Sequence, residues 1–338
     1  MDTLELIKKL VSVPAVSGTE DNLQDVLREI LEPIGTVSTD SMNNLFCTVG
    51  EGYHFLLDTH TDEIGFVVTE ITDSGFLRVS NCGGIDRRLL LAAEVSVWGK
   101  REVRGVISTL PPHLQKDGDE SKVPEIDEIA IDIGMTHDEA ASIISFGDRV
   151  TFAHYFTELL DGRISSNCLD DRAGCAAIIL ALNAVKDLPV RVTAMFSSQE
   201  EVGIRGAKVG PFGKNIDEAI AVDVSFGYTP DCKKEECGEL SKGAMIGISP
   251  ILDNEISKGL ISAAEAAGVQ YQTEIMNGVT GTNADVISIT ESGIKCGLVS
   301  IPLKYMHTPI EVIDVKDVES TANVIAAYIR EKAGVLNA

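Results

Sequence analysis

The feature that most constrains the fold is an alternation of short apolar runs with longer helical patterns. The apolar runs have the length and composition of buried strands and lie at residues 55–57, 190–198, 218–224 and 296–301. The helical patterns lie at residues 171–186, 253–267 and 315–332. Strands that alternate with helices predict an α/β fold, in which a mixed sheet is covered by helices on both faces.

The N-terminal segment predicts two further helices. Asp2 and Glu5 have the spacing of a capping box before an apolar run. A second helix is expected to begin near Ser17, with Glu20 three residues later, because the apolar residues of 23–31 fall on one helical face.

The sequence pattern of residues 67–161 differs from that of the rest of the chain. It contains short β-like pieces separated by turn signals, at residues 76–79, 94–98, 103–107 and 149–152. We therefore expect a small β-rich, barrel-like domain here. It would be inserted into an α/β domain formed by residues 1–66 and 162–338.

The charge balance excludes two classes of partner. The 338 residues include 28 Lys and Arg against 52 Asp and Glu, which gives a net charge of −24. Such a surface repels nucleic acid and anionic lipid, so neither is an expected partner. A run of about 18 apolar residues and a signal-peptide pattern are both missing from the sequence, so a cytoplasmic protein is expected.

The seven cysteines are scattered and odd in number, which indicates free thiols in a reducing compartment. Cys232 and Cys237 form a close pair. No histidine or further cysteine stands nearby to complete a zinc site, so we assign the pair no role.

Acidic residues and histidines gather where the predicted strands end. The candidate residues are His60, Asp62, Asp170, Glu200, Glu201, Asp223 and His307. The carboxyl ends of strands in an open α/β sheet meet in one crevice, so these side chains are expected to converge.

The residue types suit two divalent cations. Zinc accepts imidazole nitrogen and carboxylate oxygen, and two adjacent metal ions need a bridging carboxylate. A separate carboxylate must take a proton from the attacking water. Each short pattern alone also fits a helix cap or a solvated surface, so the prediction depends on the ordered set.

That ordered set resembles the glutamyl/tetrahedral aminopeptidases, metallopeptidase family 42, some of whose members are labelled endoglucanase M or cellulase-like. The resemblance covers essentially the whole chain, and E-E-V-G-I-R-G-A (200–207) is its most specific part. The segments that carry it are H-T-D-E-I-G (60–65), L-D-D-R-A-G (169–174), S-Q-E-E-V-G-I-R-G-A (198–207), A-V-D-V (221–224), G-T-N-A-D (281–285) and Y-M-H-T-P-I-E-V (305–312).

The resemblance implies a metal-dependent aminopeptidase that removes N-terminal residues from peptides. Two divalent ions per chain are expected, zinc first, with cobalt or manganese as alternatives. The implied metal ligands are His60, Asp170 and Asp223 for one ion and Asp170, Glu201 and His307 for the other, with Asp170 bridging.

The resemblance also implies that Glu200 is the general base and that Asp62 orients His60 through its other ring nitrogen. It implies a cis peptide bond between Asp170 and Asp171. A homo-oligomer, commonly a dodecamer, is expected, with an oligomerisation or substrate-access role for the inserted domain.

One departure from the family pattern bears on the substrate. Relatives often have G-T-D-A-G where this chain has Gly281-Thr-Asn283-Ala-Asp285, so the preferred N-terminal side chain stays open. Other readings of the site also stay open. They are a dinuclear deacylase of small N-acyl compounds, a cellulase-like glycosidase, which would need two carboxylates and no metal, and a non-catalytic scaffold.

Overall fold

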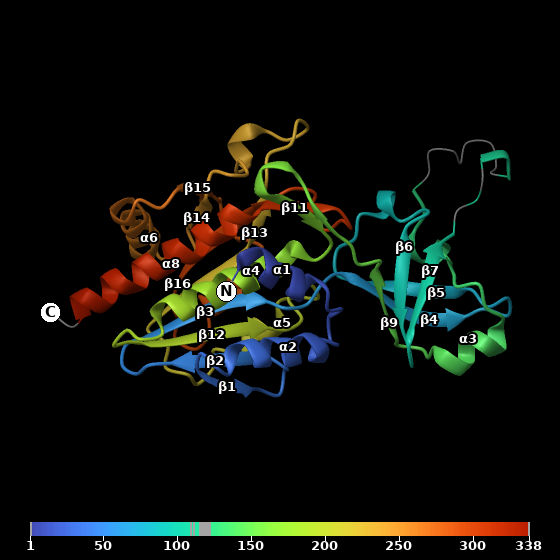
Figure 1. The fold of residues 1–338 in the computed structure, drawn as a ribbon, viewed down its shortest axis with the longest axis horizontal. Coiled ribbons are helices and arrows are strands. Elements are labelled where there is room, and N and C mark those ends of the chain that lie inside the picture. The colour runs from blue at the N-terminus through green and yellow to red at the C-terminus, as the bar shows by residue number, and fades with distance from the viewer. Residues whose placement is uncertain (1, 109, 111, 115–122, 337–338) are drawn as a thin grey trace.

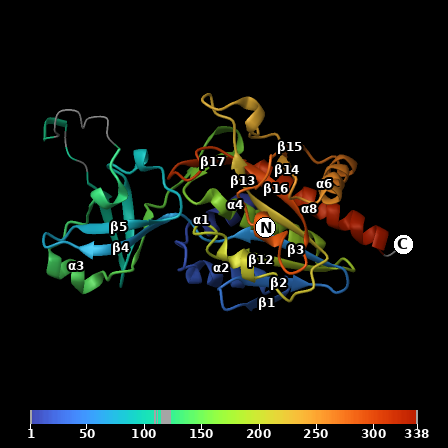
Figure 2. The same cartoon turned by 180° about the vertical axis from the view of Figure 1, so that it is seen from behind.

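The computed structural model describes residues 2–108, 110, 112–114 and 123–336. Two parts lie side by side along the long axis of the molecule, as both views show (Figures 1 and 2). One is a large sheet with helices packed on it, and the other is a small barrel. No helix among the described residues is long and apolar enough to cross a membrane.

The large part contains an eight-stranded mixed sheet. Its strands, in spatial order, are β1 (Thr36–Thr39), β2 (Leu45–Val49), β12 (Arg191–Ser197), β3 (His54–His60), β13 (Glu218–Phe226), β16 (Lys295–Leu303), β14 (Ala244–Ile248) and β15 (Tyr271–Ile275). The four central strands, β12, β3, β13 and β16, are parallel to one another. Their carboxyl ends therefore lie at the same edge of the sheet.

Helices pack against both faces of this sheet. The main core joins the sheet to α1 (Thr3–Val11), α2 (Asp21–Leu31), α4 (Leu169–Val185), α6 (Asn254–Ala267) and α8 (Val315–Leu336). A smaller core joins the other face to the short helices α5 (Arg205–Val209) and α7 (Ala284–Ile287). The predicted mixed α/β fold is confirmed.

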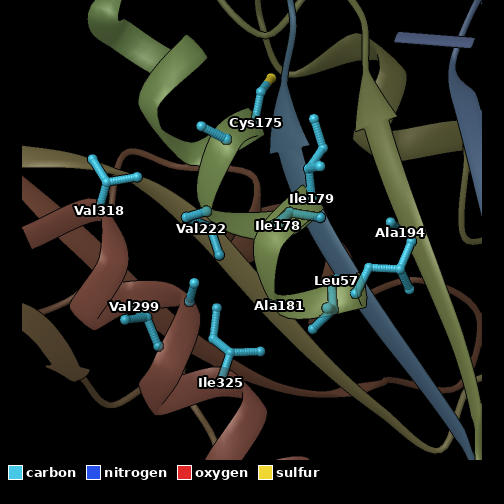
Figure 3. Close-up of a cluster of buried hydrophobic side chains, with 14 of the residues drawn as sticks. Leu57, Cys175, Ile178, Ile179, Ala181, Ala194, Val222, Val299, Val318 and Ile325 are labelled. Carbon is cyan, nitrogen blue, oxygen red and sulfur yellow. The ribbon is translucent and has the colours of Figure 1, made fainter. Parts of the chain in front are cut away.

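Alternation along the strands separates the two cores. Leu57 of β3 belongs to the main core with Ile178 of α4 and Ile325 of α8 (Figure 3). Leu56, its neighbour, belongs to the smaller core. Successive strand residues point to opposite faces, so a strand buried on both faces reads as a continuous apolar run.

The small part is a closed six-stranded barrel. Its strands are β4 (Gly65–Ile71), β5 (Leu77–Cys82), β8 (Ile131–Asp132), β7 (Glu102–Ile107), β6 (Glu94–Trp98) and β9 (Arg149–Phe152). It has its own core, which includes Phe66 and Ile131, and α3 (His137–Ile143) contributes to it. After the barrel, β10 (Phe156–Glu158) pairs with β11 (Arg163–Ser166), which pairs with β17 (Glu311–Asp314).

The predicted start of the second helix is wrong by about one turn. The helix begins at Asp21, and its N-cap residue Glu20 makes no side-chain capping bond. The Ser17 hydroxyl instead donates to Asp62 (2.6 Å), and the Glu20 carboxylate accepts from the backbone of Gln199. Partners distant in sequence thus take the groups that a local capping box would use.

Candidate metal centre

The candidate residues converge at the carboxyl edge of the central strands. His60 ends β3, Asp223 lies near the end of β13, and Glu200 and Glu201 follow β12. Asp170 lies at the start of α4, and His307 follows β16. The parallel register of these strands brings residues from 60 to 307 to one place.

Two groups of three side chains are spaced to hold a metal ion. They are His60, Asp170 and Asp223, and Asp170, Glu201 and His307, and within each group the ligand atoms lie within 4.8 Å of one another. His60 also forms such a group with Glu200 and Glu201.

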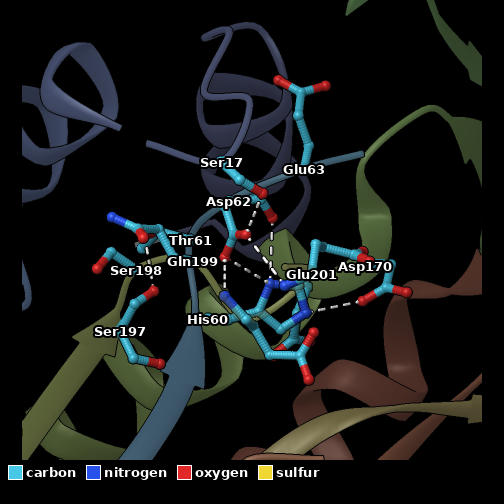
Figure 4. Close-up of polar contacts among 12 residues, drawn as sticks. Ser17, His60, Thr61, Asp62, Glu63, Asp170, Ser197, Ser198, Gln199 and Glu201 are labelled. Carbon is cyan, nitrogen blue, oxygen red and sulfur yellow. Dashed lines mark hydrogen bonds and ion pairs between the residues drawn. The ribbon is translucent and has the colours of Figure 1, made fainter. Parts of the chain in front are cut away.

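Asp170 is the member that the first two groups share. Its Oδ1 lies 3.0 Å from His60 Nε2, and its Oδ2 lies 3.4 Å from His307 Nε2 (Figure 4 shows the His60 side). The same His307 nitrogen lies 3.4 Å from Glu201 Oε1. The two Asp170 oxygens therefore face different imidazoles, as a bridging carboxylate requires.

The carboxylates of the cluster face imidazoles and other carboxylates. Burial raises the pKa of Glu201 to about 8, with a further contribution from the charge of Asp170. Burial also raises the pKa of Asp223 well above its usual range. Within the described part of the chain, no Lys or Arg forms an ion pair with them. Several carboxylates crowded together with imidazole nitrogens are a donor set that fits divalent cations.

Contact between Asp170 and the two histidines shifts the pKa values of all three side chains. Burial disfavours the charged form of both imidazoles, but the bond to Asp170 outweighs it and raises the pKa of His307 to about 9 and that of His60 well above its usual value. The pKa of Asp170 is correspondingly low despite its burial, because both histidines contact it. Ligation requires neutral imidazole, so metal uptake would release these protons.

Asp62 supports the turn that carries the two glutamates. Its carboxylate accepts from the backbone N–H of Glu200 (2.8 Å) and of Glu201 (3.1 Å), and from the Ser17 hydroxyl (Figure 4). The predicted contact with the other ring nitrogen of His60 is mainly through the Asp62 carbonyl oxygen at 3.1 Å, since the carboxylate is 3.5 Å away.

The backbone beside the site residues departs from regular geometry. Gln199 has φ = 55°, in the left-handed region, so the chain turns before Glu200 and both glutamates can face the cluster. His307 itself has φ = 59°. Non-glycine residues in this region gather at functional sites. The peptide bond between Asp170 and Asp171 is cis, as the family resemblance implied.

Glu311 is a buried site residue that was not among the residues predicted for the site. Its carboxylate accepts from the backbone N–H of Asp170 (3.1 Å) and of His307 (3.0 Å). It thereby fixes the backbone of two residues that belong to the second group. The available signal was its position four residues after His307 in Y-M-H-T-P-I-E-V.

The remaining residues singled out in the sequence lie outside the two groups. Asn283 is buried and donates to Ser197 Oγ (2.8 Å). Asp285 accepts from the backbone and hydroxyl of Thr280. Cys232 is exposed and Cys237 partly buried, and neither belongs to a metal-spaced group of described residues.

A family profile and a related protein of known name both match most of this chain. The profile of the family described as M42 glutamyl aminopeptidase matches residues 43–324. The chain is 31% identical to lysyl aminopeptidase of Pyrococcus furiosus over 334 residues, which cover 97% of this chain and 96% of that protein.

Solved structures agree with the sequence comparison. Aminopeptidase APDkam598 from the archaeon Desulfurococcus kamchatkensis superimposes with a TM-score of 0.92 at 34% identity, covering 97% of this chain and 94% of that one. The TET1 peptidase of Pyrococcus horikoshii, described as assembling into a tetrahedron or a large octahedral shell, has a TM-score of 0.86 at 32% identity. That alignment covers 96% of this chain and 98% of the other.

Proposed function

The chain belongs to the M42 glutamyl aminopeptidase family and is therefore a metal-dependent aminopeptidase, and we propose that it uses two divalent ions with Glu200 as general base. The observation that carries this proposal is the presence of Asp170 in two metal-spaced groups, with one of its oxygens toward each histidine.

The ligands divide between the two ions. His60, Asp170 and Asp223 would hold one, and Asp170, Glu201 and His307 the other, with zinc as the expected metal and cobalt or manganese as alternatives. The cluster of carboxylates without a Lys or Arg partner supports this assignment. When bound, the ions polarise the scissile carbonyl and lower the pKa of the attacking water.

Glu200 moves the proton. Burial raises the pKa of its carboxyl, and the charge of Asp62 adds to the effect, so Glu200 holds a proton more readily than an exposed glutamate. A base of this kind takes the proton from the attacking water and passes it to the leaving amine. Asp62 fixes the backbone of Glu200, and the carboxylates nearby attract the free ammonium group of the peptide.

The larger organisation is also a proposal. We expect a homo-oligomer, with a dodecamer as the first candidate, because the related TET1 peptidase assembles into closed shells. Residues 67–161 would form the inserted domain, and residues 1–66 with 162–338 the catalytic domain. The barrel would serve assembly or substrate access. The seven cysteines, none of them in a disulfide, support a cytoplasmic location.

The test is hydrolysis of matched peptides with free and acetylated N-termini, with carboxymethylcellulose alongside, before and after chelation. We expect cleavage of free-amine peptides alone, lost on chelation and restored by zinc, cobalt or manganese. Cleavage of blocked substrates would favour the deacylase. Cleavage of the polysaccharide without metal would favour the glycosidase, and either result would overturn the proposal. The same panel reads out the preferred N-terminal side chain.

A further inference from the structure

A second, isolated carboxylate lies beneath the candidate metal ligands. Asp58 is two residues before His60 on β3, so both side chains leave the strand on the same face. Its in-register neighbours are Met195 on β12 and Ala221 on β13, both in the smaller apolar core. Asp58 is fully buried among apolar side chains.

Asp58 has no compensating partner in the described part of the chain. Neither carboxylate oxygen accepts a hydrogen bond of good geometry, and the ion pairs found among the described residues do not include it. A buried charge without a cation or full hydrogen bonding destabilises a folded protein. Such a group is expected where function, and not stability, determines the residue.

Asn283 is the neutral neighbour of this carboxylate. Asn283 and Ser197 are the uncharged polar side chains that reach Asp58. The Asn283 amide donates one hydrogen to Ser197 Oγ, which in turn donates to the carbonyl oxygen of Thr59 (3.0 Å). The bond of Asn283 to Ser197 leaves its second amide hydrogen unused, and the Asp58 carboxylate is its neighbour. Asn283 thus joins the loop before α7 to β3 and β12, which end at His60 and just before Glu200.

We propose that Asp58 and Asn283 form a positioning pair that places a single carboxylate beneath the metal centre. The Asp58 charge strengthens the hold of the cluster on divalent cations, because electrostatic attraction extends further in a poorly solvated interior than in water. Because Asn283 carries a neutral amide, Asp58 has no second carboxylate beside it at that position. This inference rests on the proposed metal site.

The first test is Asp58→Asn, which keeps the shape and removes the charge. Zn²⁺ affinity is measured by competition with a chelator, and thermal unfolding is measured on the metal-free protein. We expect Zn²⁺ affinity to fall by about tenfold or more, as for other groups behind metal ligands. We expect the metal-free variant to unfold at a higher temperature than wild type, because the carboxylate that it replaces is buried without a hydrogen-bond partner. A purely structural role predicts the opposite change in unfolding temperature.

The matched control is Asp285→Asn, which removes one carboxylate from the same region. Asp285 is hydrogen-bonded to Thr280, so it is already satisfied and is not aimed at the cluster. Its Zn²⁺ affinity should stay within about threefold of wild type, because the Asp285 carboxylate is partly exposed and solvent screens its charge.

The second test exchanges the two groups. Asn283→Asp places two carboxylates in contact, so the metal-free protein should unfold at a temperature several degrees lower. The double variant D58N/N283D carries one charge again and should recover both stability and Zn²⁺ affinity. It also keeps the inference testable if either single variant fails to fold.

Failure of the proposed metal site and failure of the positioning pair give different results. Wild-type protein that binds no Zn²⁺ would remove the proposed metal site itself. Wild-type binding with unchanged affinity in Asp58→Asn would overturn only the positioning pair. Asn283→Asp with wild-type stability would show that the two side chains do not share one charge.

Discussion

The acidic residues of the centre fall into two sets by what their oxygens contact. Asp170, Glu201 and Asp223 present oxygens to the metal-spaced groups. Asp62 and Glu311 instead accept from backbone N–H groups of the residues beside them. The second set holds the first in place, so changes in either set should weaken metal binding. Glu200 belongs to neither set, and a change there should affect turnover instead.

Glu200→Gln should remove turnover and leave the metal in place. The amide cannot accept the proton of the attacking water, so kcat should fall at least about 100-fold. Metal content per chain, measured by elemental analysis, should match wild type, because Glu200 is assigned to neither ion. A variant that turns over at the wild-type rate would exclude Glu200 as the base.

Glu311→Gln should weaken metal binding without touching a metal ligand. One oxygen becomes an NH₂ group, which cannot accept from the backbone of Asp170 or His307. We expect the affinity for the more weakly held Zn²⁺ to fall by about tenfold. Glu51→Gln, at an exposed position between β2 and β3, is the control. Equal Zn²⁺ affinity in the two variants would leave Glu311 without this role.

At the scale of elements, α4 joins the site to the N-terminal helices. Arg172, fully buried on α4, donates to the carbonyl oxygens of Leu10 (2.7 Å) and Val13 (3.0 Å) near the end of α1, and to that of Thr61 just after β3. One side chain therefore satisfies three backbone carbonyl groups in two segments that are distant in sequence.

Arg172→Met should destabilise the fold. The three carbonyl groups, two of them on fully buried residues, would lose their donor. Glu63, 3.6 Å from the guanidinium, would lose a nearby positive charge. We expect the free energy of unfolding in denaturant to fall by about 3 kcal/mol. Arg330→Met, which removes an exposed guanidinium, should change it by less than about 0.5 kcal/mol. Similar losses in both variants would contradict this account.

The elements that the sequence predicted are those with a strong apolar signal. The central strands and the long helices were found because they are buried on a regular period. Strand β1 was missed because Thr36–Thr39 is mostly exposed and polar, at the edge of the sheet. The predicted strand at 55–57 stopped before Asp58, since a charge inside a buried strand is unfavourable, yet β3 continues to His60.

The sequence predicts which residue types form the site, but not the hydrogen bonds that hold them in place. Imidazoles and carboxylates after strands indicate metal chemistry, and topology then brings them together. The bonds of Ser17 to Asp62 and of Glu311 to Asp170 join residues far apart in sequence. Local patterns cannot reveal them, which is also why Ser17 was mistaken for a helix cap.

At the scale of the whole molecule, the metal-free protein binds excess protons. Burial raises the pKa of Glu20 and of Asp58 to about 7 and that of Glu201 to about 8, while contact with Asp170 raises that of His307 to about 9 against the effect of burial. Between the ordinary pKa of each group and its raised value, the folded state holds a proton that the unfolded chain has lost. Stability must therefore fall as the pH rises through that range.

The corresponding measurement is thermal unfolding of the chelated protein across pH. The unfolding temperature should be several degrees lower at about pH 8 than at about pH 6, because the raised pKa values lie in or above this interval. Added Zn²⁺ should reduce the difference, since it replaces protons in the cluster. An unfolding temperature that rises with pH in the metal-free protein would contradict the raised pKa values.

The cluster is spread along the chain from His60 to His307, so its residues are synthesised at different times. A chain grows on the ribosome from its N-terminus, so His60, Asp170 and Glu200 emerge well before His307, the last residue of the cluster. Until residue 307 has been added and has folded back beside them, the second group is incomplete. On the proposed ligand assignment, the chain can therefore hold its second ion only after nearly all of it has been synthesised.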